Sequence, residues 1–67
     1  MIRVVVNGQN LAIPRSMTIE DYCNKLGVDT RSVAVAHNGV VIRKDEFPDV
    51  LIVDGDKIEL VRAVGGG

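Results

Sequence analysis

The fold is decided at the start of the chain, where a run rich in β-branched residues ends in a dipeptide typical of tight turns, Ile2-Arg3-Val4-Val5-Val6-Asn7-Gly8. Asn and Gly tolerate the positive φ angles that a two-residue hairpin turn requires. A second short apolar run, Leu11-Ala12-Ile13, follows before Pro14. Together these features predict an N-terminal β-hairpin.

The same signal returns further along the chain. Residues 33–36 form an apolar run that leads to Asn38-Gly39, and another apolar run covers residues 40–42. This pattern predicts a second hairpin. A final strand is predicted over residues 57–64, with Ile58 and Leu60 facing the core because apolar and charged residues alternate at its start.

A short helix is predicted between the two hairpins. Thr18 is expected to cap its N-terminus, with Asp21 at the third helical position, and Gly27 is expected to end it. The helix is too short to be stable alone in water, so it must pack on a sheet. Its apolar face is predicted from the spacing i, i+3, i+4 and i+7 to consist of Ile19, Tyr22, Cys23 and Leu26.

The segment before the last strand is predicted to be an irregular crossing. Lys44-Asp45-Glu46-Phe47-Pro48 is polar and interrupted by proline, and we expect Phe47, Val50 and Leu51 to turn inward. Asp54-Gly55-Asp56 then forms a tight turn. One helix and four to five strands in this order predict a two-layer α+β domain.

The length and composition limit the classes of function. A chain of 67 residues supports one domain, predicted over residues 1–64, with a flexible glycine tail at residues 65–67. Hydrophobic residues make up 46% of the chain, but Tyr22 and Phe47 are its two aromatic residues. An enzyme with a deep pocket of its own is therefore not expected.

Charge and cysteine content indicate the kinds of partner and the cellular location to expect. Eight basic and nine acidic residues give a net charge of −1, without a run of Lys or Arg, so neither nucleic acid nor a membrane surface is expected as a partner. A signal peptide is not predicted, and the single Cys23 cannot form an internal disulfide. We expect a cytoplasmic monomer.

Four segments of the chain resemble the small β-grasp sulfur carrier proteins of thiamine biosynthesis, which share the ubiquitin fold. The segments are the opening strand with Asn7-Gly8, then 34–39, the turn 54–56, and the ending 58–67. The resemblance covers the whole chain, and the diglycine that the family pattern requires maps onto Gly66-Gly67. A sulfur carrier for molybdopterin or another cofactor remains an alternative.

The resemblance implies a specific chemistry at the C-terminus. An E1-like adenylating enzyme would use ATP and magnesium to convert the Gly67 carboxylate into an acyl-adenylate. A sulfur donor such as a cysteine desulfurase would then displace AMP, and the resulting thiocarboxylate would deliver sulfur to a thiazole synthase. Gly65 and Gly66 would enter the partner's active site, and the carrier itself would bind no cofactor or metal.

Docking is expected on the sheet face that the helix leaves open. Strand alternation places Val5, Val61 and Ala63 on that face, and Arg62 is a candidate for pairing with acidic partner residues. Val64 completes the predicted docking set.

Three other features have simpler interpretations. Cys23 lies on the apolar helix stripe and is expected to be a buried hydrophobic residue rather than a persulfide site. His37 is expected to be a solvated or hydrogen-bonded turn residue, and Asp54-Gly55-Asp56 lacks the further ligands of a calcium loop. Two other functions remain open, a ubiquitin-like modifier that is joined to lysine amines and an interaction module with an inert tail.

Overall fold

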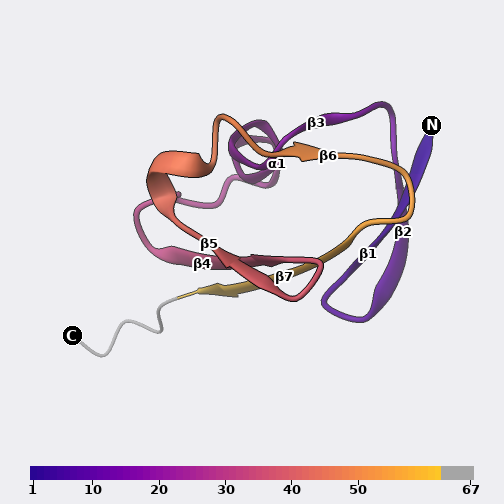
Figure 1. The fold of residues 1–67 in the computed structure, drawn as a ribbon. Coiled ribbons are helices and arrows are strands. Elements are labelled where there is room, and N and C mark those ends of the chain that lie inside the picture. Colours follow the sequence, from indigo (N-terminus) through magenta and orange to yellow (C-terminus); the bar gives the residue numbers. More distant parts are fainter. Residues whose placement is uncertain (63–67) are drawn as a thin grey trace.

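The computed structural model describes residues 1–62, which contain a mixed five-stranded sheet, one α-helix and a small two-stranded sheet (Figure 1). The predicted α+β architecture, with four to five strands and one helix, is confirmed. In chain order the elements are β1 (Ile2–Val6), β2 (Gln9–Ile13), β3 (Met17–Thr18), α1 (Ile19–Leu26), β4 (Val33–His37), β5 (Val40–Ile42), the 3₁₀ helix η1 (Lys44–Glu46), β6 (Leu51–Ile52) and β7 (Lys57–Arg62).

The large sheet has the strand order β2-β1-β7-β4-β5, which places the last strand, β7, at its centre. Strand β7 runs parallel to β1 and antiparallel to β4. Both predicted hairpins are present. Asn7 and Asn38 adopt φ angles of 50° and 52°, and each is followed by a glycine that also has a positive φ. This is the backbone geometry of the hairpin turn that Asn-Gly favours.

Helix α1 lies across one face of the sheet, as Figure 1 shows. The Thr18 Oγ1 accepts a hydrogen bond of 3.1 Å from the Asp21 backbone N–H, which confirms the predicted N-cap. Between the helix and the sheet lies an aliphatic core with one tyrosine and one phenylalanine. Its buried residues are Val4, Val6, Ile13, Ile19, Tyr22, Cys23, Val28, Val33, Val35, Ile42, Phe47, Ile52 and Ile58.

The C-terminal end of α1 corrects the prediction for Leu26, which is 45% exposed. Gly27 adopts the left-handed conformation, and the backbone N–H groups of Gly27 and Val28 donate to the carbonyls of Asn24 and Cys23. This Schellman motif turns the chain back over the helix end, so Val28 enters the core in place of Leu26.

In the crossing before β7, the structure corrects the prediction for a second residue, Leu51. Phe47 is buried and Val50 is partly buried, as expected, but Leu51 is 52% exposed and Ile52 is fully buried. The cause is the pairing of β6 with β3, which aligns Leu51 with Thr18. Side chains alternate along a strand, so only one of two adjacent residues can face the core. Neither β3 nor β6 was predicted, nor was the 3₁₀ helix at the start of the crossing.

The predicted boundary between the domain, residues 1–64, and the glycine tail, residues 65–67, lies outside the described residues. Among residues 1–62, α1 is the one α-helix, and it is far shorter than a bilayer-spanning helix must be.

Candidate functional site

Strand β7 leads directly to the terminal glycine segment, and both of its neighbours hold it in place. Strand β4 pairs with β7 from Val33 opposite Arg62 to His37 opposite Ile58. Strand β1 pairs with β7 over a shorter stretch, with Val5 and Val6 aligned to Lys57 and Ile58. The backbone of β7 is thus fixed in the sheet up to its last residue, Arg62.

The side chain of Asn7 extends the shorter pairing. Its Nδ2 donates to the Leu60 carbonyl at 3.3 Å, and its Oδ1 accepts from the Leu60 N–H at 2.8 Å. The amide therefore makes the two hydrogen bonds that another β1 residue would have made, although the chain has already turned away. The sequence indicated Asn7 only as a turn residue, and its second role went unpredicted.

The sheet face opposite α1, here called the outer face, carries exposed apolar residues beside β7. Val61 is 65% exposed and pairs across the sheet with Ala34, while Val41 pairs with Ala36. A shallow cavity of about 120 Å³ lies between them, lined by Ala34, Val35, Ala36, Val41, Glu59 and Val61. Exposed aliphatic surface of this kind is a common feature of protein interaction sites.

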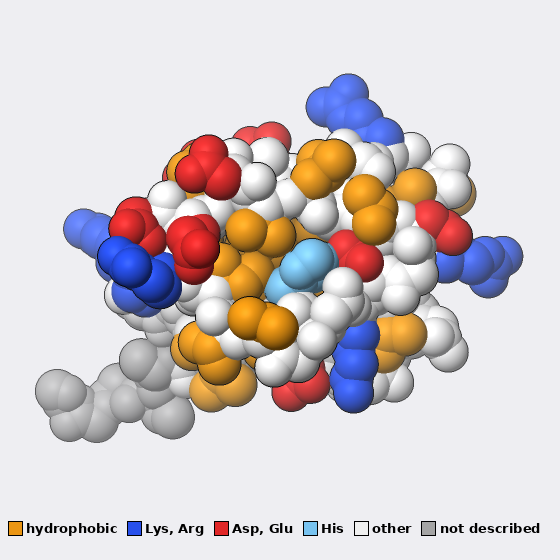
Figure 2. Space-filling view, viewed as in Figure 1, with side chains coloured by type: hydrophobic (Ala, Val, Ile, Leu, Met, Phe, Trp, Pro, Cys, Tyr) orange, Lys and Arg blue, Asp and Glu red, His pale blue; other side chains and the backbone are white. Residues whose placement is uncertain are grey.

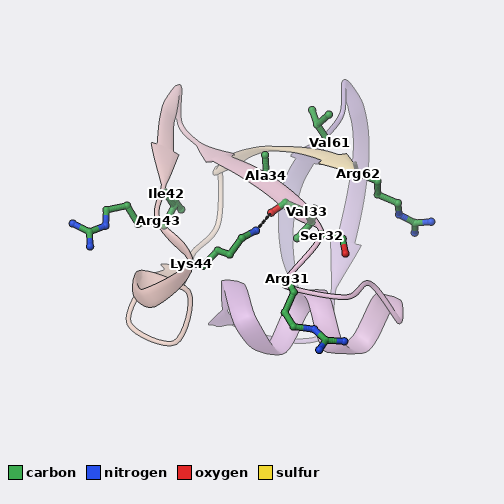
Figure 3. Close-up of a pocket in the computed structure, with 9 residues that line it drawn as sticks. All are labelled: Arg31, Ser32, Val33, Ala34, Ile42, Arg43, Lys44, Val61 and Arg62. Carbon is green, nitrogen blue, oxygen red and sulfur yellow. Dashed lines mark hydrogen bonds between the residues drawn. The ribbon is translucent and has the colours of Figure 1, made fainter. Parts of the chain in front are cut away.

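The predicted docking residues are only partly brought together. Val5 shares the outer face with Val61 but is aligned with Lys57, four residues earlier along β7, which at about 3.3 Å per residue is roughly 13 Å away. Arg62 points to the other side of the strand from Val61 (Figure 3). Ala63, Val64, Gly65, Gly66 and Gly67 lie outside the described residues. Val41, Ala34 and Ala36 were missed by the sequence analysis.

The start of β4, the end of β5 with the beginning of η1, and the end of β7 together line a second hollow, here called the basic groove (Figure 3). Its volume is about 530 Å³, and four of the eight Lys and Arg residues of the chain line it without any acidic residue. The sequence showed no such cluster because the four residues come from three separate segments. The lining residues are Arg31, Ser32, Val33, Ala34, Ile42, Arg43, Lys44, Val61 and Arg62.

Two of the arginines in the groove already have carboxylate partners. Arg31 Nε lies 3.1 Å from Asp29 Oδ1, and Arg43 donates to Asp45 at 2.9 Å. Hydrogen bonds from Arg31 lower the pKa of the Asp29 carboxyl below its ordinary value. Both ion pairs are exposed, so each contributes little to stability and is open to exchange with another anion.

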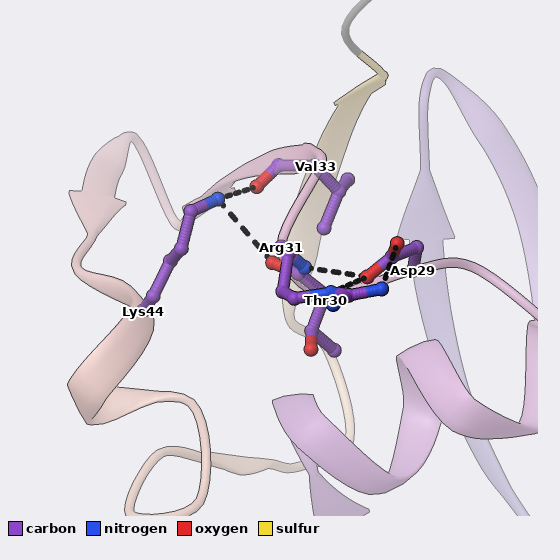
Figure 4. Close-up of polar contacts among 5 residues, drawn as sticks. All are labelled: Asp29, Thr30, Arg31, Val33 and Lys44. Carbon is purple, nitrogen blue, oxygen red and sulfur yellow. Dashed lines mark hydrogen bonds and ion pairs between the residues drawn. The ribbon is translucent and has the colours of Figure 1, made fainter.

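Lys44 holds the rim of the groove together. Its Nζ donates to the carbonyls of Val33 at 3.0 Å and Thr30 at 3.3 Å, as Figure 4 shows beside the Asp29–Arg31 pair. These bonds tie η1 to the segment that enters β4. Within residues 1–62, neither Lys44 nor Arg62 forms an ion pair with a carboxylate.

The remaining candidate residues have structural roles. Cys23 is fully buried, and burial raises the pKa of its thiol, which disfavours the reactive thiolate and confirms the predicted hydrophobic role. His37, the one histidine of the chain and pale blue in Figure 2, hydrogen-bonds to Asp56, as a turn residue was expected to do. Among residues 1–62, His, Cys, Asp and Glu side chains form no group of three that could hold a metal ion.

Comparison with known proteins identifies the family to which the chain belongs. The sequence model described as the ThiS family matches residues 2–67. The chain belongs to the ThiS family. The resemblance inferred from the sequence is confirmed, and so is the β-grasp fold, a ThiS-type sheet packed on one helix.

Solved structures support the assignment of this ThiS family member. The crystal structure of the thiamine biosynthesis protein ThiS from Geobacter metallireducens is 28% identical, with a TM-score of 0.85. The alignment covers 98% of this chain and 100% of that one. The solution structure of a thiamine biosynthesis protein from the same organism gives a TM-score of 0.81, covering 98% and 88% of the two chains at 28% identity.

A curated relative comes from Paramagnetospirillum magneticum. A thiazole synthase of that organism is 41% identical over 66 residues, which are 98% of this chain but only 20% of the relative. This ThiS family member thus spans one fifth of that relative's length.

Proposed function

We propose that this protein is a sulfur carrier of thiamine biosynthesis whose reacting group is the Gly67 carboxylate. The observation that carries the proposal is the ThiS family match, which extends through residue 67 and so includes all three terminal glycines. The protein is then a cosubstrate, consumed and regenerated in each cycle, rather than a catalyst.

The chemistry follows from the low reactivity of a carboxylate toward nucleophiles. An E1-like adenylating enzyme transfers AMP from ATP, with magnesium, to a Gly67 oxygen and releases pyrophosphate. The persulfide of a donor such as a cysteine desulfurase then displaces AMP to form an acyl disulfide, and a thiol attacks the donor's sulfur of that S–S bond, so that a new disulfide forms and the C-terminal sulfur is released. The product is a C-terminal thiocarboxylate, which a thiazole synthase consumes. The match to a thiazole synthase supports this last partner.

The anchoring of β7 limits where the partner can dock. Gly67, the proposed reacting residue, lies five residues after Arg62, and an extended chain of that length spans at most about 16–18 Å. The partner's reactive centre therefore lies within that distance of Arg62, so its contacts with the domain must surround the end of β7. Val61 meets this condition. Val5, roughly 13 Å further back along β7, lies toward the far edge of such a contact.

The outer face supplies the apolar part of that contact. Val61 and Val41 present exposed aliphatic side chains next to the two small residues Ala34 and Ala36, which let a partner side chain approach the sheet. Interfaces of this kind have an apolar centre and a polar rim. We propose the part of the outer face around Val61 as the centre of the docking contact. We also propose that the protein acts as a monomer in the cytoplasm.

ATP–pyrophosphate exchange tests the adenylation step. The adenylating enzyme from the same organism is incubated with ATP, magnesium and labelled pyrophosphate, with and without this protein. We expect exchange that depends on the intact chain and is lost when Gly66 and Gly67 are deleted. The truncated protein should keep the wild-type melting temperature. Equal stimulation of exchange by the truncated and intact proteins would reject a reaction at Gly67.

A further inference from the structure

We infer that the basic groove binds an acidic surface of the adenylating enzyme, beside the channel that receives the C-terminus. The inference rests on the proposed function, because that function requires a partner around the end of β7. It adds a second contact area to the outer face, one that recognises charge rather than apolar surface.

The position of the groove is the first argument. Val61 and Ala34 line both the basic groove and the shallow cavity on the outer face, so the two areas are continuous. Arg62 is the last described residue before the terminal segment. A partner that holds the segment after Arg62 and covers Val61 therefore lies directly beside the groove.

The charge of the groove is the second argument. The chain carries a net charge of −1, yet half of its basic residues line this one hollow. Arg31 and Arg43 form ion pairs with Asp29 and Asp45, whereas neither Lys44 nor Arg62 forms an ion pair with a carboxylate of residues 1–62, although Lys44 is near enough to Asp29 to help lower the pKa of its carboxyl. The groove is therefore positive on a protein that is negative overall, and carboxylates complement it.

The directions of the side chains identify the kind of anion. In Figure 3 the guanidinium groups of Arg31, Arg43 and Arg62 point away from one another, and the aliphatic side chains of Val33 and Ile42 lie between them. A phosphate or other small anion requires donors that converge on one point. Divergent arginines around an apolar floor instead suit an extended protein surface, with separated carboxylates and an apolar side chain between them.

Lys44 has a structural role in the groove, unlike Arg43 and Arg62. Because its Nζ is held by two backbone carbonyls, it positions the rim, and replacing it would disturb the fold. Arg43 and Arg62 are the better probes. Their removal changes charge without breaking a bond to the backbone in the described structure.

The experiment measures association with the adenylating enzyme. The double variant R43Q/R62Q is compared with R15Q/K25Q, which removes the same charge near α1, where Arg15 and Lys25 line a separate hollow. Both variants have a net charge of −3, from −1 − 2. Association rate constants are measured by stopped-flow at several salt concentrations. Melting temperatures confirm that both variants are folded.

Steering by charge acts mainly on the association rate and weakens with salt. At low salt we expect R43Q/R62Q to associate about tenfold more slowly than wild type, and R15Q/K25Q to stay within about twofold. The difference should vanish near 0.5 M salt, where the Debye length is only about 4 Å. If the two double variants associate at equal rates, the assignment of the basic groove as a contact is rejected, and the proposed function is not affected.

Two other outcomes overturn the inference in distinguishable ways. If wild-type protein neither binds the enzyme nor stimulates ATP–pyrophosphate exchange, the proposed function fails and the groove assignment fails with it. If inorganic pyrophosphate binds the isolated wild-type protein but not R43Q/R62Q, the groove is a small-anion site rather than a protein contact.

Discussion

His37 Nε2 lies 2.7 Å from Asp56 Oδ2, and this contact joins the β4–β5 turn to the turn that precedes β7. The same buried carboxylate accepts hydrogen bonds from the Asn38 side chain at 3.1 Å and the Val53 N–H at 2.9 Å. Asn38 in turn bonds to the backbone of Lys57, the first residue of β7. One carboxylate therefore fixes the start of the strand that leads to the glycines.

Replacing Asp56 with Asn should destabilise the protein. An amide offers one acceptor oxygen in place of two, so a donor of His37, Asn38 or Val53 loses its partner in a buried place. We expect the free energy of unfolding to fall by about 2–4 kcal/mol, as measured by urea denaturation. Asp49→Asn is the matched control, because Asp49 is exposed, and its effect should stay within about 0.5 kcal/mol. Similar losses in both variants would contradict this role for Asp56.

The same carboxylate should make stability depend on pH. Burial alone would raise the pKa of Asp56, but the hydrogen bonds from Val53, His37 and Asn38 outweigh burial and lower it below the ordinary 3.8. The unfolded state then binds more protons near pH 4, so stability falls as the pH drops from about 5 through the lowered pKa.

Denaturation at pH 6, 4 and 3 in high salt checks this direction. High salt weakens the exposed Asp29–Arg31 ion pair and so suppresses its contribution to stability, which would otherwise also change as the Asp29 carboxyl takes up a proton at low pH. The stability difference between wild type and Asp56→Asn should shrink as the pH falls. A difference that stays constant from pH 6 to pH 3 would show that the charge of Asp56 is not responsible.

The end of α1 yields a comparison between two neighbouring apolar residues. Val28 is in the core and Leu26 is not, although the smaller residue lies after the helix. We expect Val28→Ala to cost about 1–3 kcal/mol and Leu26→Ala less than about 1 kcal/mol, because Ala also favours helix. Thermal denaturation of the two variants decides the point, and a larger loss at Leu26 would contradict the structure.

The outer face can be probed at Val61 without unfolding the protein. Val61→Ser should lower the affinity for the adenylating enzyme about fivefold to tenfold, since it removes an apolar contact from the centre of the proposed interface. Val40→Ser is a close control, because Val40 is 66% exposed against 65% for Val61 but does not line the outer-face cavity. Calorimetric titration measures both affinities. Equal weakening by the two substitutions would place the interface elsewhere.

The local signals in the sequence were sufficient for most of the fold. Asn7-Gly8 and Asn38-Gly39 specify their turns through backbone conformation alone, and Thr18 and Gly27 bound the helix for similar local reasons. Such features depend on residues close together in the chain. They could therefore be predicted without knowledge of the tertiary structure.

The features that were missed depend on contacts between distant segments. Strands β3 and β6 have two residues each and exist only because they pair with each other, and this pairing decides that Leu51 faces outward. The amide of Asn7 meets Leu60 across 53 positions of sequence. The basic groove likewise unites residue 31, the adjacent residues 43 and 44, and residue 62, and no pattern along the chain marks these three segments as neighbours.

The central claim is that the terminal carboxylate of Gly67 becomes a thiocarboxylate, and intact-protein mass spectrometry tests it most directly. The protein is incubated with its adenylating enzyme, ATP, magnesium and a sulfur source, and fragmentation then locates any change in mass. We predict the exchange of one oxygen for one sulfur, confined to Gly67 and absent without ATP. An unchanged mass in the presence of demonstrably active enzyme, or a sulfur atom located at Cys23 instead, would contradict the account.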